Sequence, residues 1–189
     1  MPRSNNEIKN AVVAGKSVYL RKPVLQDMKE FLALNSASTQ LHRGLVSPPK
    51  QPTQFAAFLK RSRRADSACF LICRVEDHRM VGSINLSQIF LGRFRNAYLG
   101  YFIGAPYAGR GYMKETIRLM LRYAFTHLKL HRLEANIQPE NLASVALVKG
   151  AGFIREGYSR RYLKICGRWR DHERWAILAE DWKTNSRSR

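Results

Sequence analysis

The sequence predicts a single domain of the mixed α/β class, for three reasons. A length of 189 residues suits one domain with a core of ordinary size. Hydrophobic residues make up 45% of the chain and charged residues 25%, a composition that excludes a disordered chain. Short apolar runs typical of strands alternate with segments whose apolar residues recur at helical spacing, so strands and helices are expected together.

The first half of the chain is expected to mix strands with two helices. The expected elements are strands at 18–22, 68–75, 80–89 and 97–103 and helices at 25–35 and 53–65. Pro23 ends the first strand, and helical spacing follows it. Thr53 comes after a proline-rich loop and is the expected N-cap of the second helix. Turn-like residues 76–78 make the next two strands a hairpin, and a basic loop at 90–96 leads into the fourth strand.

The second half is expected to contain a strand–helix–strand unit and a final hairpin. A helix begins at Tyr112 and carries Ile117, Leu121 and Phe125 on one apolar stripe. The remaining expected elements are a strand at 131–137, a helix at 142–149, and strands at 153–165 and 169–178 that join at residues 166–167. Residues 1–16 and 184–189 are expected to be flexible basic ends of a single domain, residues 17–183.

The chain is strongly basic. It has 33 Lys and Arg residues against 14 Asp and Glu residues, a formal net charge of +19. Basic residues cluster at 60–64 and again at 155–174. Such a surface attracts polyanions, namely nucleic acid, the ribosome or an anionic membrane, and it disfavours a small cationic substrate such as a polyamine.

The three cysteines, Cys69, Cys73 and Cys166, are an odd number without metal-ligand spacing. We expect buried free thiols in a reducing cytoplasm, with Cys69 and Cys73 on one face of a strand. No metal site is expected, because no cluster of His, Cys and Asp supports one. No stretch approaches the roughly 20 apolar residues that a membrane span needs, and a secretory signal is not expected.

Residues 99–115 combine the end of a strand, a glycine-rich turn and the start of a helix. The first N–H groups of a helix have no partner within it, and together with the helix dipole they form an anion site. Gly109 and Gly111 let the backbone approach a phosphate closely, and Arg110 adds charge. Neither Gly-x-Gly-x-x-Gly nor Gly-Lys-Ser/Thr occurs, which argues against a dinucleotide fold and a nucleoside triphosphatase loop. Taken alone, a simple left-handed turn explains the pattern equally well.

The motifs Ala108-Gly-Arg-Gly111-Tyr-Met113, Asn141-Leu-Ala-Ser144 and Ala151-Gly152-Phe153 resemble those of the GNAT superfamily of acetyl-CoA-dependent N-acetyltransferases. The pyrophosphate loop of that family reads Gln/Arg-x-x-Gly-x-Gly/Ala, so this chain keeps the central glycine and departs at both flanks. Further segments resemble the bacterial ribosomal-protein-alanine N-acetyltransferases, the RimJ/RimL branch, at residues 98–104, 131–136, 153–158 and 167–172. The resemblance covers roughly residues 17–182 and is dense from residue 81 onward.

The resemblance implies the GNAT fold, in which helices flank a central, mostly antiparallel, twisted sheet with a splayed pair of strands. It implies acetyl-CoA, or coenzyme A, as the cofactor. The backbone of the splayed strand would pair with pantetheine, and the N–H groups of 109–113 would hold the pyrophosphate. The cofactor-binding residues implied are Tyr101, Phe102, Ile103, Gly104, Ala108, Gly109, Arg110, Gly111, Tyr112, Met113, Asn141 and Ser144.

The resemblance also implies roles in catalysis. Ser144 would stabilise or protonate the leaving thiolate, because Val148 stands where many relatives have a tyrosine acid; local backbone bonding is the other interpretation of this serine. Amine attack needs a proton acceptor, and Glu134 and Asn136 share one strand face. Glu134 could act directly or through water, or could be an ordinary solvent-facing charge. Residues 169–172 suit either peptide binding or sheet packing.

The resemblance implies an enzyme that transfers acetyl to the N-terminal alanine amine of a ribosomal protein, by direct attack in a ternary complex. The backbone at residues 102–103 would polarise the thioester carbonyl. The basic surface would then contact ribosomal RNA, and a monomer and a homodimer both remain open. Two alternatives stand beside this hypothesis. One is acetylation of a small-molecule amine, such as an antibiotic or a nucleotide-linked amino acid, and the other is a non-catalytic ribosome- or RNA-binding protein of the same fold.

Overall fold

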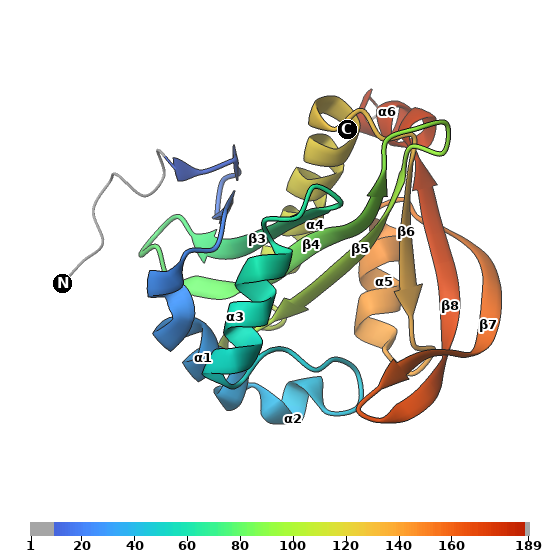
Figure 1. The fold of residues 1–189 in the computed structure, drawn as a ribbon. Coiled ribbons are helices and arrows are strands. Elements are labelled where there is room, and N and C mark those ends of the chain that lie inside the picture. The colour runs from blue at the N-terminus through green and yellow to red at the C-terminus, as the bar shows by residue number, and fades with distance from the viewer. Residues whose placement is uncertain (1–9, 188–189) are drawn as a thin grey trace.

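A mixed eight-stranded sheet runs through residues 10–187, the part of the chain that the computed structural model describes (Figure 1). Its strand order is β1-β2-β3-β4-β5-β6-β8-β7. Every neighbouring pair is antiparallel except β5 and β6, which are parallel. The strands are β1 (Val13–Ala14), β2 (Val18–Arg21), β3 (Ser67–Arg74), β4 (Met80–Phe90), β5 (Asn96–Ile103), β6 (Arg132–Ile137), β7 (Ile154–Ile165) and β8 (Arg168–Leu178). The mixed α/β class predicted from the sequence is confirmed.

Helices cover both faces of this sheet (Figure 1). They are α1 (Met28–Ala37), α2 (Thr39–His42), α3 (Pro52–Arg61), α4 (Tyr112–Arg122), α5 (Leu142–Gly150) and α6 (Ala179–Arg187). Strand β3 shows how the faces divide, because alternate side chains enter different cores. Phe70 and Ile72 pack in the core with α4 and α5, whereas Leu71 packs with α1 and α3.

The smaller core is built on phenylalanines. The Phe31 ring lies 5.2 Å from that of Phe55 and 5.0 Å from that of Phe58, and all three side chains are buried. Cys69 and Cys73 enter the same core from β3, so the prediction that they share one buried face is confirmed. The prediction of a buried thiol is wrong for Cys166, which is exposed in the turn between β7 and β8.

The parallel pair β5–β6 opens part-way along its length. Cα partners join Asn96–Tyr98 to Arg132–Glu134, and no pairing continues beyond them. From there β5 and β6 diverge toward their carboxyl ends (Figure 1). Ligands in open α/β sheets bind outside the carboxyl ends of strands, and the separation of this pair makes room for one here.

Both predicted flexible ends need correction. Val13–Ala14 forms β1 by pairing with β2, and residues 179–187 form α6, in which Trp182 packs 5.6 Å from Phe125. The remaining residues of the two predicted ends, 1–9 and 188–189, lie outside the described residues. Helix α3 begins at Pro52 with Gln51 as N-cap, so Thr53 is not the cap. No helix in residues 10–187 is long and apolar enough to cross a membrane.

Candidate functional site

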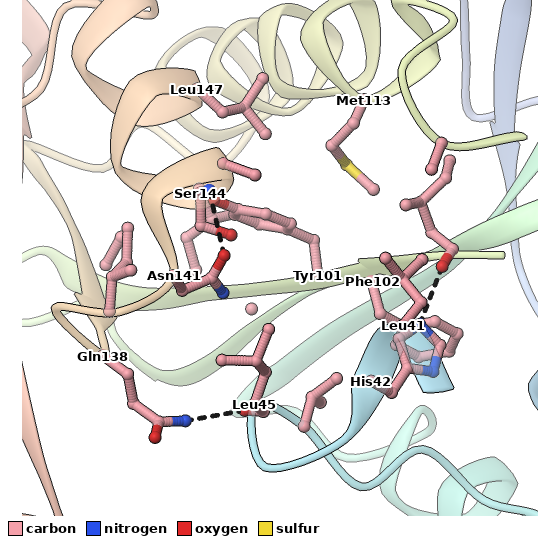
Figure 2. A pocket seen from close by; sticks show the side chains of 18 of the residues that line it. Leu41, His42, Leu45, Tyr101, Phe102, Met113, Gln138, Asn141, Ser144 and Leu147 are labelled. Carbon is pink, nitrogen blue, oxygen red and sulfur yellow. Dashed lines mark hydrogen bonds between the residues drawn. The ribbon is translucent and has the colours of Figure 1, made fainter. Parts of the chain in front are cut away.

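A pocket of about 490 Å³ lies where β5 and β6 separate. Its walls come from both strands, from the turn before α4, from the start of α5 and from the chain around α2 (Figure 2). Of the predicted site residues, those that line it are Tyr101, Phe102, Ile103, Ala108, Gly109, Arg110, Gly111, Tyr112, Met113, Asn136, Asn141 and Ser144. Gly104 and Glu134 do not line the pocket.

The turn before α4 leaves a row of backbone N–H groups free at one end of the pocket. Gly109 and Gly111 have φ angles of +73° and +81°, in the left-handed region that favours glycine. Gly111 is the N-cap of α4 and provides no side-chain cap. The first backbone hydrogen bond of α4 runs from the N–H of Glu115 to the carbonyl of Gly111, so the N–H groups of residues 112–114 have no acceptor inside the helix. Arg110 and Lys114 add two positive charges to this wall, which suits an anionic ligand.

The second wall is the start of α5. The backbone N–H of Ser144 donates to Oδ1 of Asn141, the N-cap residue, at 3.2 Å (Figure 2). This cap uses the backbone of Ser144, not its hydroxyl. The ring of Tyr101 extends from β5 toward Ser144 (Figure 2). Burial raises the pKa of the Tyr101 phenol, and the Ser144 hydroxyl lies close enough to oppose that rise without the geometry of a full hydrogen bond. A pair of hydroxyls, the buried oxygen of Tyr101 and the half-buried side chain of Ser144, therefore lies at the positive end of a helix dipole.

Strand β6 places its two candidate residues differently. Asn136 lies where β6 no longer pairs with β5 and lines the pocket, and its Oδ1 atom is buried without a hydrogen-bond partner. Glu134 lies opposite Tyr98, where β5 and β6 are still paired. The Glu134 carboxylate accepts hydrogen bonds from Nε of Arg132 at 2.9 Å and from Nδ2 of Asn96 at 3.3 Å. The structure thus does not bring Glu134 to the site, because strand pairing and an ion pair hold it elsewhere.

Part of the pocket wall, formed by the chain around α2 and by β7, is apolar. The side chains that line it there are Leu41, Leu45, Val46, Leu163 and Ile165. Three contacts hold this region together. Nε2 of Gln138 donates to the backbone carbonyls of Gly44 (2.9 Å) and Leu45 (3.2 Å), and Figure 2 shows Gln138 beside Leu45. The Ser47 hydroxyl lies 3.1 Å from Sγ of Cys166. No Asp or Glu lines the pocket anywhere among the described residues.

Two buried histidines line the pocket, and neither was predicted as a site residue. Nε2 of His42 lies 2.8 Å from the carbonyl oxygen of Ile103, and Nδ1 of His172 lies 3.0 Å from that of Arg170 (Figure 2 shows His42). Burial lowers the pKa of both imidazoles. His172 belongs to the segment 169–172 for which peptide binding and sheet packing were both open, whereas no local pattern distinguishes His42.

The described residues hold no group of three His, Cys, Asp or Glu side chains that could bind a metal ion. The site instead offers an anion-binding turn, an open edge between β5 and β6, a hydroxyl pair and two imidazoles. This arrangement can bind a long ligand with an anionic end and can assist proton transfer at its other end.

Comparison with known proteins places these features in context. Residues 17–154 match the acetyltransferase (GNAT) domain family. A "Probable N-acetyltransferase YjcK" of Bacillus subtilis is 34% identical over 178 residues, which cover 90% of this chain and 98% of the relative. A "[Ribosomal protein uS5]-alanine N-acetyltransferase" of Escherichia coli is 38% identical over 107 residues, 57% of this chain and 55% of that relative.

Among solved structures, one similar chain is Mycobacterium smegmatis RimJ in complex with CoA-disulfide. The two chains superpose with a TM-score of 0.79 at 29% identity, over 86% of this chain and 82% of that chain.

Proposed function

The chain belongs to the GNAT acetyltransferase family, and we propose that its acceptor is the N-terminal α-amine of a ribosomal protein, with alanine as the first residue. It is an acetyl-CoA-dependent N-acetyltransferase, and the similarity to a ribosomal-protein-alanine enzyme and to RimJ supports the RimJ/RimL branch. The acceptor is the new part of the proposal. The observation that carries it is a pocket without a carboxylate, whose acceptor end is lined by aliphatic side chains.

The pocket residues fit acetyl-CoA. Gly111 leaves open space where a Cβ atom would project, so a phosphate can approach the free N–H groups of the turn. Beyond Tyr98, the edge of β5 that faces β6 has no strand partner and can exchange backbone hydrogen bonds with a ligand, which suits the amide groups of pantetheine. Acetyl-CoA supplies an activated acetyl group as a thioester when it is bound.

The acceptor end favours a small neutral residue over a polyamine. A polyamine carries several positive charges, and each would lose water on entry without an anionic partner in the pocket. Leu41, Val46 and Leu163 instead offer an apolar wall for a side chain such as that of alanine. The pocket would therefore bind an N-terminal alanine more tightly than a polyamine, and this difference in affinity would set the specificity.

An α-amine also suits the site better than a lysine side chain does. The amine must be neutral to attack, and the pKa of an α-amine is about 7.7–8.0 against about 10.4 for lysine. At neutral pH the neutral fraction of an α-amine is therefore several hundred times larger, on the order of 10² to 10³. We assign Ser144 to the protonation of the leaving sulfur, with Tyr101 beside it and the start of α5 stabilising negative charge there.

The basic surface supports an acceptor that sits on a polyanion. Strands β7 and β8 carry Arg160, Lys164 and Arg168, which have no ion pair within the described residues. Leu163 and Ile165 of the same hairpin line the pocket, so these charges lie on an element that forms its wall. We propose that they steer the enzyme to ribosomal RNA in the cytoplasm.

A panel of acceptors tests this proposal, with release of the CoA thiol as the readout. The panel contains a peptide with a free N-terminal alanine, the same peptide with that amine blocked and one internal lysine, spermidine, and an aminoglycoside. We expect turnover of the free alanine peptide and at most about 1% of that rate for the others. Preferential turnover of spermidine or the aminoglycoside would instead support a small-molecule enzyme. No turnover of any amine would support a protein that binds RNA without catalysis.

A second experiment tests the role of the charge. Acetylation of ribosome-bound protein should fall steeply as salt rises from about 50 to 200 mM, because phosphate contacts release counterions. Acetylation of the free peptide should fall much less, since its interaction with the pocket is apolar. Equal losses for the two acceptors would contradict steering by RNA.

A further inference from the structure

His172 lies on β8, and its buried side chain lines the pocket. We infer that Nε2 of His172 is the general base that takes the proton from the attacking amine. The inference rests on the proposed function and names the base that Glu134 was expected to provide.

The first step of the argument is the tautomer of His172. Its side chain is buried, and Nδ1 lies 3.0 Å from the carbonyl oxygen of Arg170. A carbonyl only accepts hydrogen bonds, so Nδ1 carries the proton and donates it. In the neutral ring, Nε2 then holds a free lone pair. This atom has no hydrogen-bond partner among the described residues, and it is not among the side-chain atoms that are sealed from solvent. The lone pair of Nε2 is therefore accessible.

The second step is elimination among the ionisable groups that line the pocket. They are His42, Tyr101, Tyr107, Arg110, Tyr112, Lys114 and His172. Arginine and lysine side chains are protonated at neutral pH, and a neutral tyrosine hydroxyl acts as a proton donor. Only the two histidines can accept a proton, since no carboxylate is present.

His42 is the weaker candidate of these two histidines. Its Nε2 faces the carbonyl of Ile103 at 2.8 Å and must donate, so any lone pair belongs to Nδ1. That Nδ1 atom is sealed from solvent and has no partner. An amine in the pocket cannot reach it without movement of α2. His42 is better placed to fix the end of β5, where its ring also packs 5.6 Å from that of Phe102.

The surroundings of His172 keep it neutral enough to act. Burial lowers its pKa, while the hydrogen bond to Arg170 and the charges of Asp171 and Glu140 oppose that effect. The ring of Tyr162 from β7 lies 6.0 Å from the His172 ring. Arg170, two positions before His172 on β8, has a buried Nε atom. Because burial lowers its pKa, the imidazole is neutral at neutral pH and can accept a proton.

The transfer balances with these groups alone. The lone pair of the acceptor nitrogen forms the N–C bond to the acetyl carbonyl carbon, and one N–H proton moves to Nε2 of His172. The C–S bond breaks, and the sulfur takes the electron pair and receives a proton from Ser144. The proton on His172 then returns to the Ser144 oxygen through water, which restores the serine hydroxyl and the neutral imidazole and leaves no net change in protons.

The test uses the full chain and the alanine peptide. His172→Asn keeps a side-chain N–H that can donate to the Arg170 carbonyl but removes the basic nitrogen, so kcat should fall about 100-fold, the usual contribution of a general base. The KM for acetyl-CoA and the thermal stabilisation by acetyl-CoA should change less than about threefold, because neither depends on the base. His78→Asn is the matched control. It removes a buried imidazole that does not line the pocket, at a positive φ that asparagine tolerates, and kcat should stay within about twofold of the original enzyme.

Chemical rescue separates a base from a packing group. Added imidazole should raise the kcat of His172→Ala at least about tenfold. Pyrazole has the same shape but is a far weaker base, so it should leave that kcat unchanged. Equal rescue by both compounds would overturn the inference, as would His172→Asn with more than about half of the original kcat. If the unaltered enzyme fails to acetylate the peptide, the proposed acceptor is wrong. If it succeeds and the variant is equally active, only the base is wrong.

Discussion

Gly111→Ala tests whether the glycine turn binds phosphate or only turns the chain. At Gly111 the φ angle is +81°, and a Cβ atom would meet no protein atom within 4 Å. The substitution therefore costs only the left-handed backbone strain of an alanine, about 1–2 kcal/mol. For a chain of this size each kcal/mol lowers Tm by about 2–4 °C, so the variant should melt about 2–8 °C lower.

The effect on the cofactor should be larger than this strain implies. Gly111 lines the pocket, and the added methyl group occupies open space beside the N–H groups of residues 112–114, where a phosphate would approach. At 100 times its Kd, acetyl-CoA stabilises the original protein by about 2.7 kcal/mol. If the methyl group raises Kd tenfold, the same concentration is only ten times the new Kd, and the stabilisation falls to about 1.4 kcal/mol.

Gly167→Ala is the matched control for that experiment. Gly167 has a φ of +80° and equally open surroundings, but it lies in the β7–β8 turn and does not line the pocket. Thermal melts of both variants with and without acetyl-CoA should show similar losses of Tm without ligand, and a reduced ligand shift only for Gly111→Ala. A ligand shift that is unchanged in Gly111→Ala, or reduced equally in both, would refute phosphate binding by this turn.

Three further predictions concern the hydroxyl pair, the two pocket histidines and the cysteines. Ser144→Ala and Tyr101→Phe should each lower kcat about 10- to 100-fold with little change in acetyl-CoA binding; an unchanged kcat in steady-state assays would remove both from sulfur protonation. The free energy of unfolding should fall as pH drops from about 6.5 through the lowered pKa of His42 and of His172, because the unfolded chain binds those protons first. Denaturant titrations at about pH 7 and pH 5 check this, and a His172→Asn variant that loses as much stability would count against it. A maleimide should label Cys166 in the native protein but not Cys69 or Cys73, since both are buried; labelling of all three before unfolding would contradict the described core.

Residue spacing predicted the strands and helices whose apolar side chains recur at a regular strand or helix period. The alternation of β3 into two cores and the apolar stripe of α4 follow directly from residue spacing. Helix α6 was missed because its sequence is polar, and its burial comes from the contact of Trp182 with Phe125. Strand β1 was missed for a similar reason, since two residues carry no period and only pairing with β2 defines them.

The site divides in the same way. The chemistry of the glycine turn is local, so Gly109 and Gly111 could be predicted from spacing. Spacing also placed Glu134 and Asn136 on one face, but it could not tell that β5 and β6 stop pairing between those two positions. His42 reaches the pocket through the contact with Ile103, which lies 61 residues away in the sequence, and no short-range pattern reports such a contact.

The most direct test of the proposed acceptor is mass spectrometry of ribosomal protein N-termini from cells with and without this enzyme. The account predicts that one N-terminal alanine is acetylated only when the enzyme is present, a difference of about 42 Da on a single ribosomal protein. Restoring the gene should restore the acetyl group, and restoring His172→Asn at equal abundance should not. An identical set of N-terminal masses with and without the enzyme would contradict the proposed function.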